Sequence, residues 1–128
     1  MKAKQLSSTI TVKVNNKTIK CKFYAYKYAN PFKSYKIGSK EMKSGFNKGQ
    51  EYKSPKAYKK QTVTIKTNSN WVIYRAYIKR NGKIEDFGYK KFPNKITLKN
   101  ISLNSKSSLI VYAYNKKTGV YGPWYIHR

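Results

Sequence analysis

A chain of 128 residues with 29 Lys and Arg and only 4 Asp and Glu has a formal net charge of +25 at pH 7. The hydrophobic fraction of 39% and the 13 tyrosines exclude a disordered tail, and the length suffices for a core without disulfides. An AT-rich genome would favour Lys codons, but it would not remove Asp and Glu. The shortage of acids therefore indicates a polyanionic partner.

Apolar and polar residues alternate through most of the chain, in segments rich in Val, Ile, Thr and Tyr, which predicts half-buried β-strands. Asn81-Gly82 predicts a type I′ hairpin turn, because both central positions of that turn need a positive φ. No segment has a helical period. We expect eight strands, at residues 8–14, 18–28, 61–67, 71–79, 83–91, 95–101, 108–115 and 120–127.

Residues 27–60 break this alternation. Asn30-Pro31, Gly38 and Ser54-Pro55 interrupt a stretch that carries ten Lys and two Glu. Stretches of this length without a periodic pattern are typical of functional loops or disorder. We therefore expect a long basic loop or insertion at about residues 27–60, within a single β domain that spans residues 1–128.

A weak internal repeat links residues 11–27, 64–77 and 97–114, each of which runs from a Thr-aliphatic-Lys triplet to an Ala-Tyr pair. We interpret each unit as one β-hairpin. The fold class that the pattern favours is all-β, as a single antiparallel β-sandwich. A trefoil-like arrangement or a small β-barrel is the alternative, because three similar hairpins permit it.

Residues 96–101 and 109–115 resemble the final strands of immunoglobulin-like and fibronectin type III modules. In those families a tyrosine usually occupies the corner of the penultimate strand, and Leu109 stands at the comparable position. The resemblance implies a sandwich of two sheets.

Nucleophilic catalysis needs convergent titratable groups, and the chain has one Cys and one His. Cys21 alternates with lysines and shares a strand face with Ile19, Phe23 and Ala25, which predicts a core position rather than a nucleophile paired with His127. With one thiol, no intramolecular disulfide is possible.

The four carboxylates do not suggest an acid–base pair either. Glu85 and Asp86 are adjacent on an expected strand, so they point to opposite faces, while Glu41 and Glu51 lie in the expected basic loop. No Cys/His cluster or glycine-rich phosphate loop is present. We expect a non-enzymatic protein without a metal or a cofactor.

The outward faces of the expected strands carry lysine and tyrosine together. Lysines attract phosphate, sulfate or carboxylate groups, and exposed tyrosine rings stack on sugars or bases. The expected partner is an anionic polymer: a teichoic acid, an acidic polysaccharide or a nucleic acid. A cationic antibacterial protein or toxin that acts on cell envelopes is a further alternative. The predicted binding residues are Lys13, Lys20, Lys22, Tyr24, Tyr26, Lys66, Lys95, Lys99, Tyr112 and Tyr114.

Residues 76–83, Ala-Tyr-Ile-Lys-Arg-Asn-Gly-Lys, resemble the Lys/Tyr-rich wall-anchoring repeats of surface-layer proteins from lactic acid bacteria. The resemblance implies attachment to anionic wall polymers. The chain contains no apolar run of 18 residues that would predict a membrane-spanning helix. We expect a secreted or cell-surface protein whose signal peptide has been removed.

Overall fold

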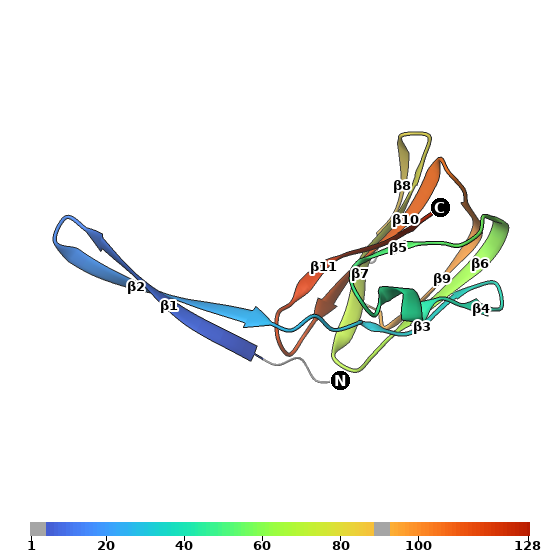
Figure 1. Cartoon of the computed structure of the whole chain (residues 1–128). Helices are drawn as coiled ribbons and strands as arrows, with labels where there is room; N and C mark the ends of the chain where they lie inside the picture. Colours follow the sequence, from blue (N-terminus) through green and yellow to red (C-terminus); the bar gives the residue numbers. More distant parts are fainter. Residues whose placement is uncertain (1–4, 89–92) are drawn as a thin grey trace.

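The computed structural model describes residues 5–88 and 93–128, together with their side chains apart from those of residues 5–8, 10, 21–26 and 88. Each of the eight expected strands is present, and the end of the expected strand 83–91 lies outside the described residues. The elements, labelled in Figure 1, are β1 (Gln5–Val14), β2 (Lys17–Tyr26), β3 (Phe32–Ile37), β4 (Lys40–Glu41), the 3₁₀ turn η1 (Lys43–Phe46), β5 (Glu51–Lys53), β6 (Tyr58–Thr67), β7 (Trp71–Arg80), β8 (Lys83–Gly88), β9 (Lys95–Leu103), β10 (Ser107–Asn115) and β11 (Tyr121–His127).

Two sheets pack face to face around one core, so the expected all-β sandwich is confirmed. One sheet has the strand order β5-β11-β10-β7-β8 and the other has the order β4-β3-β6-β9. Each described strand pair is antiparallel except β11 with β5, which is parallel. The order β3-β6-β9 opposite β8-β7-β10-β11 is that of an immunoglobulin-like sandwich with its first, second and fifth strands in one sheet.

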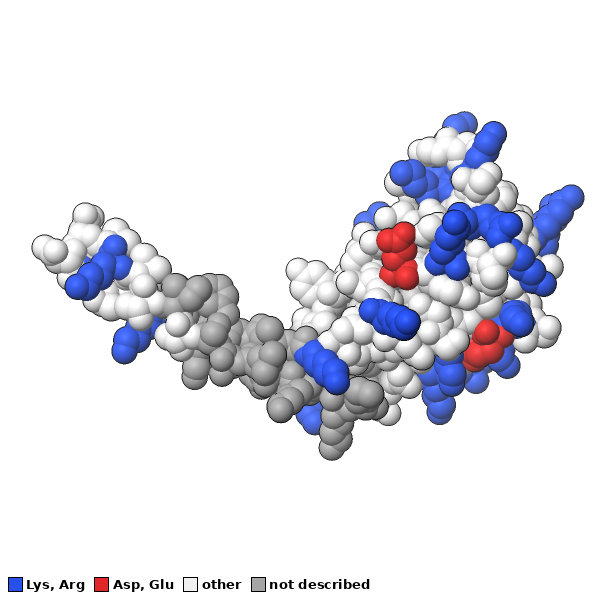
Figure 2. Space-filling model, in the orientation of Figure 1, with Lys and Arg blue, Asp and Glu red and all other residues white. Residues whose placement is uncertain are grey.

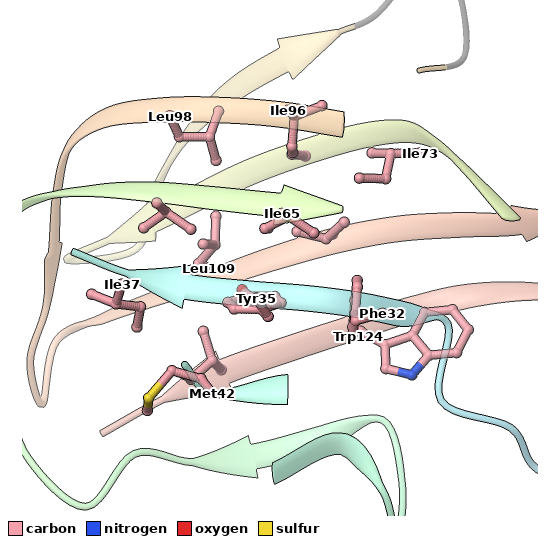
Figure 3. Packing of buried hydrophobic residues seen from close by; sticks show 14 of the residues in the cluster. Phe32, Tyr35, Ile37, Met42, Ile65, Ile73, Ile96, Leu98, Leu109 and Trp124 are labelled. Atoms are coloured by element: carbon pink, nitrogen blue, oxygen red, sulfur yellow. The ribbon is translucent and has the colours of Figure 1, made fainter. Parts of the chain in front are cut away.

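The core lies between the two sheets because every second residue of each strand points inward. Ile65 and Ile96 from the smaller sheet meet Ile73 and Leu109 from the larger one, and all four are 4% exposed or less (Figure 3). Trp124 closes one end of the core, with its ring 5.6 Å from Trp71 and 6.1 Å from Phe32, both edge-on. Edge-to-face contacts of this kind add to the free energy gained by burying the rings.

The interpretation of residues 27–60 as a long basic loop was wrong. This segment contains β3, β4, η1 and β5, and β6 begins at Tyr58. Phe32, Tyr35 and Ile37 of β3 are buried in the core. The pairing of β3 with β6 shifts register between Phe32 and Ser34, so the inward residues stand three and then two positions apart. This irregularity hides the period of two on which the sequence prediction relied.

The internal repeat does not correspond to three hairpins. Only residues 11–27 contain one, because β6 and β7 belong to different sheets, and so do β9 and β10. Residues 64–77 and 97–114 each cross from the smaller sheet to the larger one. The structure is thus a sandwich and neither a trefoil nor a barrel. The predicted hairpin turn at Asn81-Gly82 is confirmed, with φ values of 49° and 79°.

Strands β1 and β2 form a separate two-stranded sheet, here called the arm, which projects away from the sandwich (Figure 1). Tyr28 fixes the chain between arm and sandwich. Its single hydroxyl proton is shared between the carbonyl oxygens of Phe46 and Gly49, at 2.5 and 2.8 Å, and its oxygen accepts from Trp124 Nε1 at 3.0 Å. Burial raises the pKa of Tyr28 above its ordinary value, although the Trp124 hydrogen bond lowers it.

The position of Ile19 in the arm tests part of the prediction for the surroundings of Cys21. Ile19, which was expected in the core beside Cys21, is 49% exposed, because neither sheet of the sandwich, as described for residues 27–88 and 93–128, packs on the arm. The expectation for Ile19 was wrong. The side chains of Cys21, Phe23 and Ala25 lie outside the described ones, and the backbone of Cys21 pairs with Ile10 in the arm.

Candidate binding faces

The outer side of the smaller sheet carries lysines and hydroxyl side chains. Residues directly opposite one another on neighbouring strands point to the same face, so the pairs Ser34–Lys66, Thr64–Thr97 and Lys66–Lys95 share the outer face. The buried residues between them point into the core. We call this surface the lysine–threonine face, and it consists of Ser34, Lys36, Thr62, Thr64, Lys66, Lys95, Thr97 and Lys99.

Two lysines of this face lie directly opposite each other. Lys66 on β6 is the register partner of Lys95 on β9, and both side chains are exposed. Like charges at directly opposed positions of a sheet destabilise it. The pair therefore costs some folding free energy in the isolated protein, and an anion placed between the two ammonium groups would relieve that repulsion.

One carboxylate, Glu41, borders the lysine–threonine face, as the register partner of Lys36. Its oxygens accept hydrogen bonds from Ser34 Oγ at 2.7 Å and from the backbone amides of Tyr35 and Met42 at 2.7 and 3.1 Å. Burial acts to raise the pKa of Glu41, but these hydrogen bonds outweigh it and lower the pKa below its usual value. Glu41 thus serves the β3–β4 turn.

The outer side of the larger sheet is lined by tyrosines. Three successive rows across β7, β10 and β11 hold Tyr77–Ile110–Tyr125, then Tyr74 beside Tyr112–Pro123, then Val72–Tyr114–Tyr121. We call this surface the tyrosine face. It contains six of the 13 tyrosines of the chain: Tyr74, Tyr77, Tyr112, Tyr114, Tyr121 and Tyr125.

The rings of this face contact one another. The Tyr112 ring lies 5.6 Å from the Tyr74 ring and 5.9 Å from the Tyr77 ring, tilted by 50° and 31°. A hydrogen bond between the Tyr77 and Tyr112 hydroxyls, together with partial burial, raises the pKa of Tyr77 above its ordinary value. Burial likewise raises the pKa of Tyr74. Both phenols are therefore neutral at physiological pH and keep their protons as hydrogen-bond donors.

Charged groups among the tyrosines are paired. Arg75 donates from Nε and Nη2 to Asp86 Oδ2, at 3.1 and 2.7 Å, and its guanidinium also lies 5.4 Å from the centre of the Tyr77 ring. His127 Nε2 and Glu51 Oε1 lie 2.7 Å apart at the side of the sheet formed by β11 and β5. The tyrosine face therefore offers rings and hydroxyls rather than a net charge.

The ten predicted binding residues do not form one surface. Lys66, Lys95 and Lys99 lie together on the lysine–threonine face, whereas Tyr112 and Tyr114 lie on the opposite side of the sandwich. Lys13 and Lys20 are exposed near the tip of the arm. The side chains of Lys22, Tyr24 and Tyr26, on the same arm, lie outside the described ones.

The expected mixture of lysine and tyrosine on one face is therefore not what the sandwich presents. Figure 2 shows basic side chains spread over the visible surface of the sandwich and at the tip of the arm, with acidic ones confined to small patches. The two chemistries separate because each sheet has its own outer face, and the sequence pattern does not reveal which strands share a sheet.

Sequence reasoning missed one lysine and four tyrosines of these faces. Lys36 was assigned to the loop, although it alternates with the buried Tyr35 and Ile37. Tyr77, Tyr121 and Tyr125 alternate with buried residues such as Ala76 and Trp124, a signal that was available in the sequence. Tyr74 gives no such signal, because a period of two from Tyr77 would place it on the inner side, and a register shift between β7 and β10 brings it beside Tyr112.

The groups considered for catalysis are engaged elsewhere. His127 contacts Glu51, and Asp86 pairs with Arg75 on the outer face. Glu85 is opposite Ile78, whose side chain is buried, while Asp86 is opposite Tyr77. The two carboxylates thus belong to opposite faces of β8, as the alternation predicts.

Within residues 5–88 and 93–128, no group of three or more His, Cys, Asp and Glu side chains is placed to hold a metal ion. The same residues include no helix that is long and apolar enough to cross a membrane.

Fold and surface together define an immunoglobulin-like β-sandwich with two chemically distinct outer faces and a projecting arm. Comparison of the sequence with protein-family models, with curated proteins and with solved structures found no match.

Proposed function

We propose that this protein is a non-enzymatic, extracellular protein that binds an anionic polymer through the lysine–threonine face. The observation that carries the proposal is the direct opposition of Lys66 and Lys95 on a sheet surface whose bordering carboxylate, Glu41, is occupied by hydrogen bonds. Binding of a chain of anionic groups to such a surface lowers the free energy, because it neutralises charges that repel one another.

The composition of this face favours a polymer of phosphate or sulfate groups that also carries hydroxyls. Thr62, Thr64 and Thr97 supply hydroxyl groups between the lysines, and the described residues of the face include no aromatic ring. Stacking on nucleic-acid bases, which relies on aromatic side chains, is therefore not offered here. The chain also has three Arg against 26 Lys, and bidentate readout of bases depends on arginine.

A teichoic acid or an acidic polysaccharide fits these properties better than a nucleic acid does. The resemblance of residues 76–83 to wall-anchoring repeats supports a wall polymer as the ligand, and those residues form the β7–β8 hairpin. Secretion or display on the cell surface follows from that choice, because such polymers lie outside the cell.

Substitution of four lysines tests the proposal against simple charge attraction. Lys36→Gln, Lys66→Gln, Lys95→Gln and Lys99→Gln together remove the charge of the lysine–threonine face. The matched control replaces four exposed lysines outside this face and outside residues 76–83 by Gln, at Lys48, Lys106, Lys116 and Lys117, so that both variants have the same net charge.

Binding of both variants to purified teichoic acid, heparin and single-stranded DNA is measured by calorimetry at one salt concentration. We expect the face variant to lose at least about tenfold in affinity for teichoic acid or heparin, since each phosphate contact contributes separately, and the control to lose far less. An equal loss in both variants would mean that binding follows total charge and that this face is not the site.

A further inference from the structure

The residues of the tyrosine face pack against one another, so this face is an organised surface and not a set of unrelated surface residues. Val72 and Ile110 lie on this outer side and outside the core between the sheets, yet they are only 6% and 7% exposed. Side chains on the outer surface must therefore cover them, and the tyrosines occupy the neighbouring positions. The result is a layer of six tyrosines over a small apolar base, in which the Tyr112 ring contacts the rings of Tyr74 and Tyr77.

The rings of this layer still reach the surface. Tyr121 is 71% exposed, the largest value among the exposed large apolar and aromatic side chains of the described residues, and Tyr74, Tyr77, Tyr112, Tyr114 and Tyr125 are each partly exposed. A tyrosine presents an apolar ring and a hydroxyl on the same side chain. The layer thus combines flat apolar surface with hydroxyl groups that donate and accept hydrogen bonds.

The charge distribution argues against an anionic ligand here. Within the three tyrosine rows the guanidinium of Arg75 is paired with Asp86. On the outer side of this sheet, the described cations without a carboxylate partner, Lys53 and Lys79, lie in the next row, beside His127 and Ser108. A polyanion crossing the tyrosine rows would find no free cation there among the described residues.

A second copy of the chain is also disfavoured as the occupant. The net charge of +25 opposes the approach of two identical molecules. An uncharged ligand meets neither obstacle. Sugar rings have an apolar face of C–H groups that packs on an aromatic ring, and hydroxyls at their edges that pair with phenols.

We propose that the tyrosine face is a second binding site, specific for the sugar rings of a neutral glycan. It acts independently of the lysine–threonine face, because the two surfaces lie on opposite sides of the sandwich. The protein would then bridge an anionic polymer and an uncharged polysaccharide, with Tyr74, Tyr112 and Tyr121 as the stacking residues.

The test uses a panel of neutral oligosaccharides, namely chitohexaose, cellohexaose, maltohexaose, a β-1,3-glucan hexamer and mannohexaose, titrated into the full chain by calorimetry. We expect binding to at least one of them. Tyr121→Ala and Tyr112→Ala should each lower that affinity about tenfold, while the four-lysine face variant should bind as wild type does. Tyr121→Ala removes an exposed ring, so its fold is expected to be intact; circular dichroism verifies this.

Three outcomes would overturn the inference. One is the absence of binding to every oligosaccharide of the panel at millimolar concentration. Another is a loss of teichoic acid or heparin affinity in the tyrosine variants, which would assign this face to the polyanion. The last is a concentration-dependent dimer in sedimentation that Tyr121→Ala dissolves, since the occupant would then be a second copy. The first and last of these leave the lysine–threonine site unaffected.

Discussion

The two outer faces of the sandwich share one core and differ in almost every other property. On the smaller sheet Lys66 and Lys95 oppose each other across neighbouring strands, and two further lysines and four hydroxyl side chains occupy the remaining positions of the face. On the larger sheet the Tyr112 ring contacts the rings of Tyr74 and Tyr77, and the arginine beside them is paired. Among the described residues, the lysines of one face thus form no ion pair. The arginine of the other face is paired with an aspartate of the same face.

This difference shows that the net charge alone does not predict how the charges are distributed over the surface of the protein. A value of +25 suggests a uniform polycation. Among the described residues, the sandwich instead places four lysines on the outer face of the smaller sheet and none in the central rows of the larger one. The affinities of the two faces, one for an anionic ligand and one for a neutral ligand, are therefore expected to respond differently to the same change in salt concentration.

Salt should separate the two faces most strongly. Four lysine contacts to a polyanion give a slope of about −3 to −4 for log K against log salt, a loss of about 100-fold in affinity between about 50 and 200 mM. Stacking of a neutral sugar releases no counterions, so its affinity should change by less than about twofold. Calorimetric titrations of heparin and of the best-binding oligosaccharide across this range measure both. An equal salt dependence of the two affinities would contradict the proposed difference between the two faces.

Lys66→Thr should shift stability and binding in opposite directions. Removal of the repulsion between Lys66 and Lys95 is expected to raise the free energy of unfolding by about 0.5 kcal/mol at low salt. The same change deletes one polyanion contact and should lower the affinity for heparin several-fold. Urea unfolding and calorimetry measure the two effects. Lys106→Thr, in the turn between β9 and β10, is the control and should change neither appreciably.

The smallest effect is expected from Tyr112→Phe, which keeps the ring and removes the hydroxyl. The pKa of Tyr77 is raised mainly by its hydrogen bond with Tyr112, so this variant should lower the pKa of Tyr77 toward its ordinary value. The stability that this raised pKa confers is present below the unfolded pKa of about 10 and is lost as pH rises through the folded value. NMR titration of the assigned Tyr77 ring resonances measures the shift, and an unchanged Tyr77 midpoint would contradict the assignment.

Much of the fold was predictable because the period of two is a local property of the sequence. The eight expected strands and the Asn81-Gly82 turn follow from alternation and from the need for positive φ. Strand β3 was missed where a register shift after Phe32 interrupts the alternation. The repeat was misread because a chain that crosses between sheets has the same local pattern as a hairpin.

The candidate binding faces were predictable only in part. Alternation correctly placed Lys66, Lys95 and Lys99 on an outward face, and it did the same for Tyr112 and Tyr114. Which strands share a sheet depends on pairings distant in sequence, such as β6 with β9, and no local pattern encodes them. The separation of lysines from tyrosines therefore required the structure.

Chemical-shift mapping tests the central claim most directly. The backbone amides of ¹⁵N-labelled protein are followed by NMR while teichoic acid fragments or a heparin oligosaccharide are added. We predict shifts that centre on the lysine–threonine face, at residues such as Lys36, Thr64, Lys66, Lys95 and Thr97, with amides around Tyr112 and Tyr121 unchanged. Shifts centred on the tyrosine rows, or spread evenly over all exposed lysines, would contradict it.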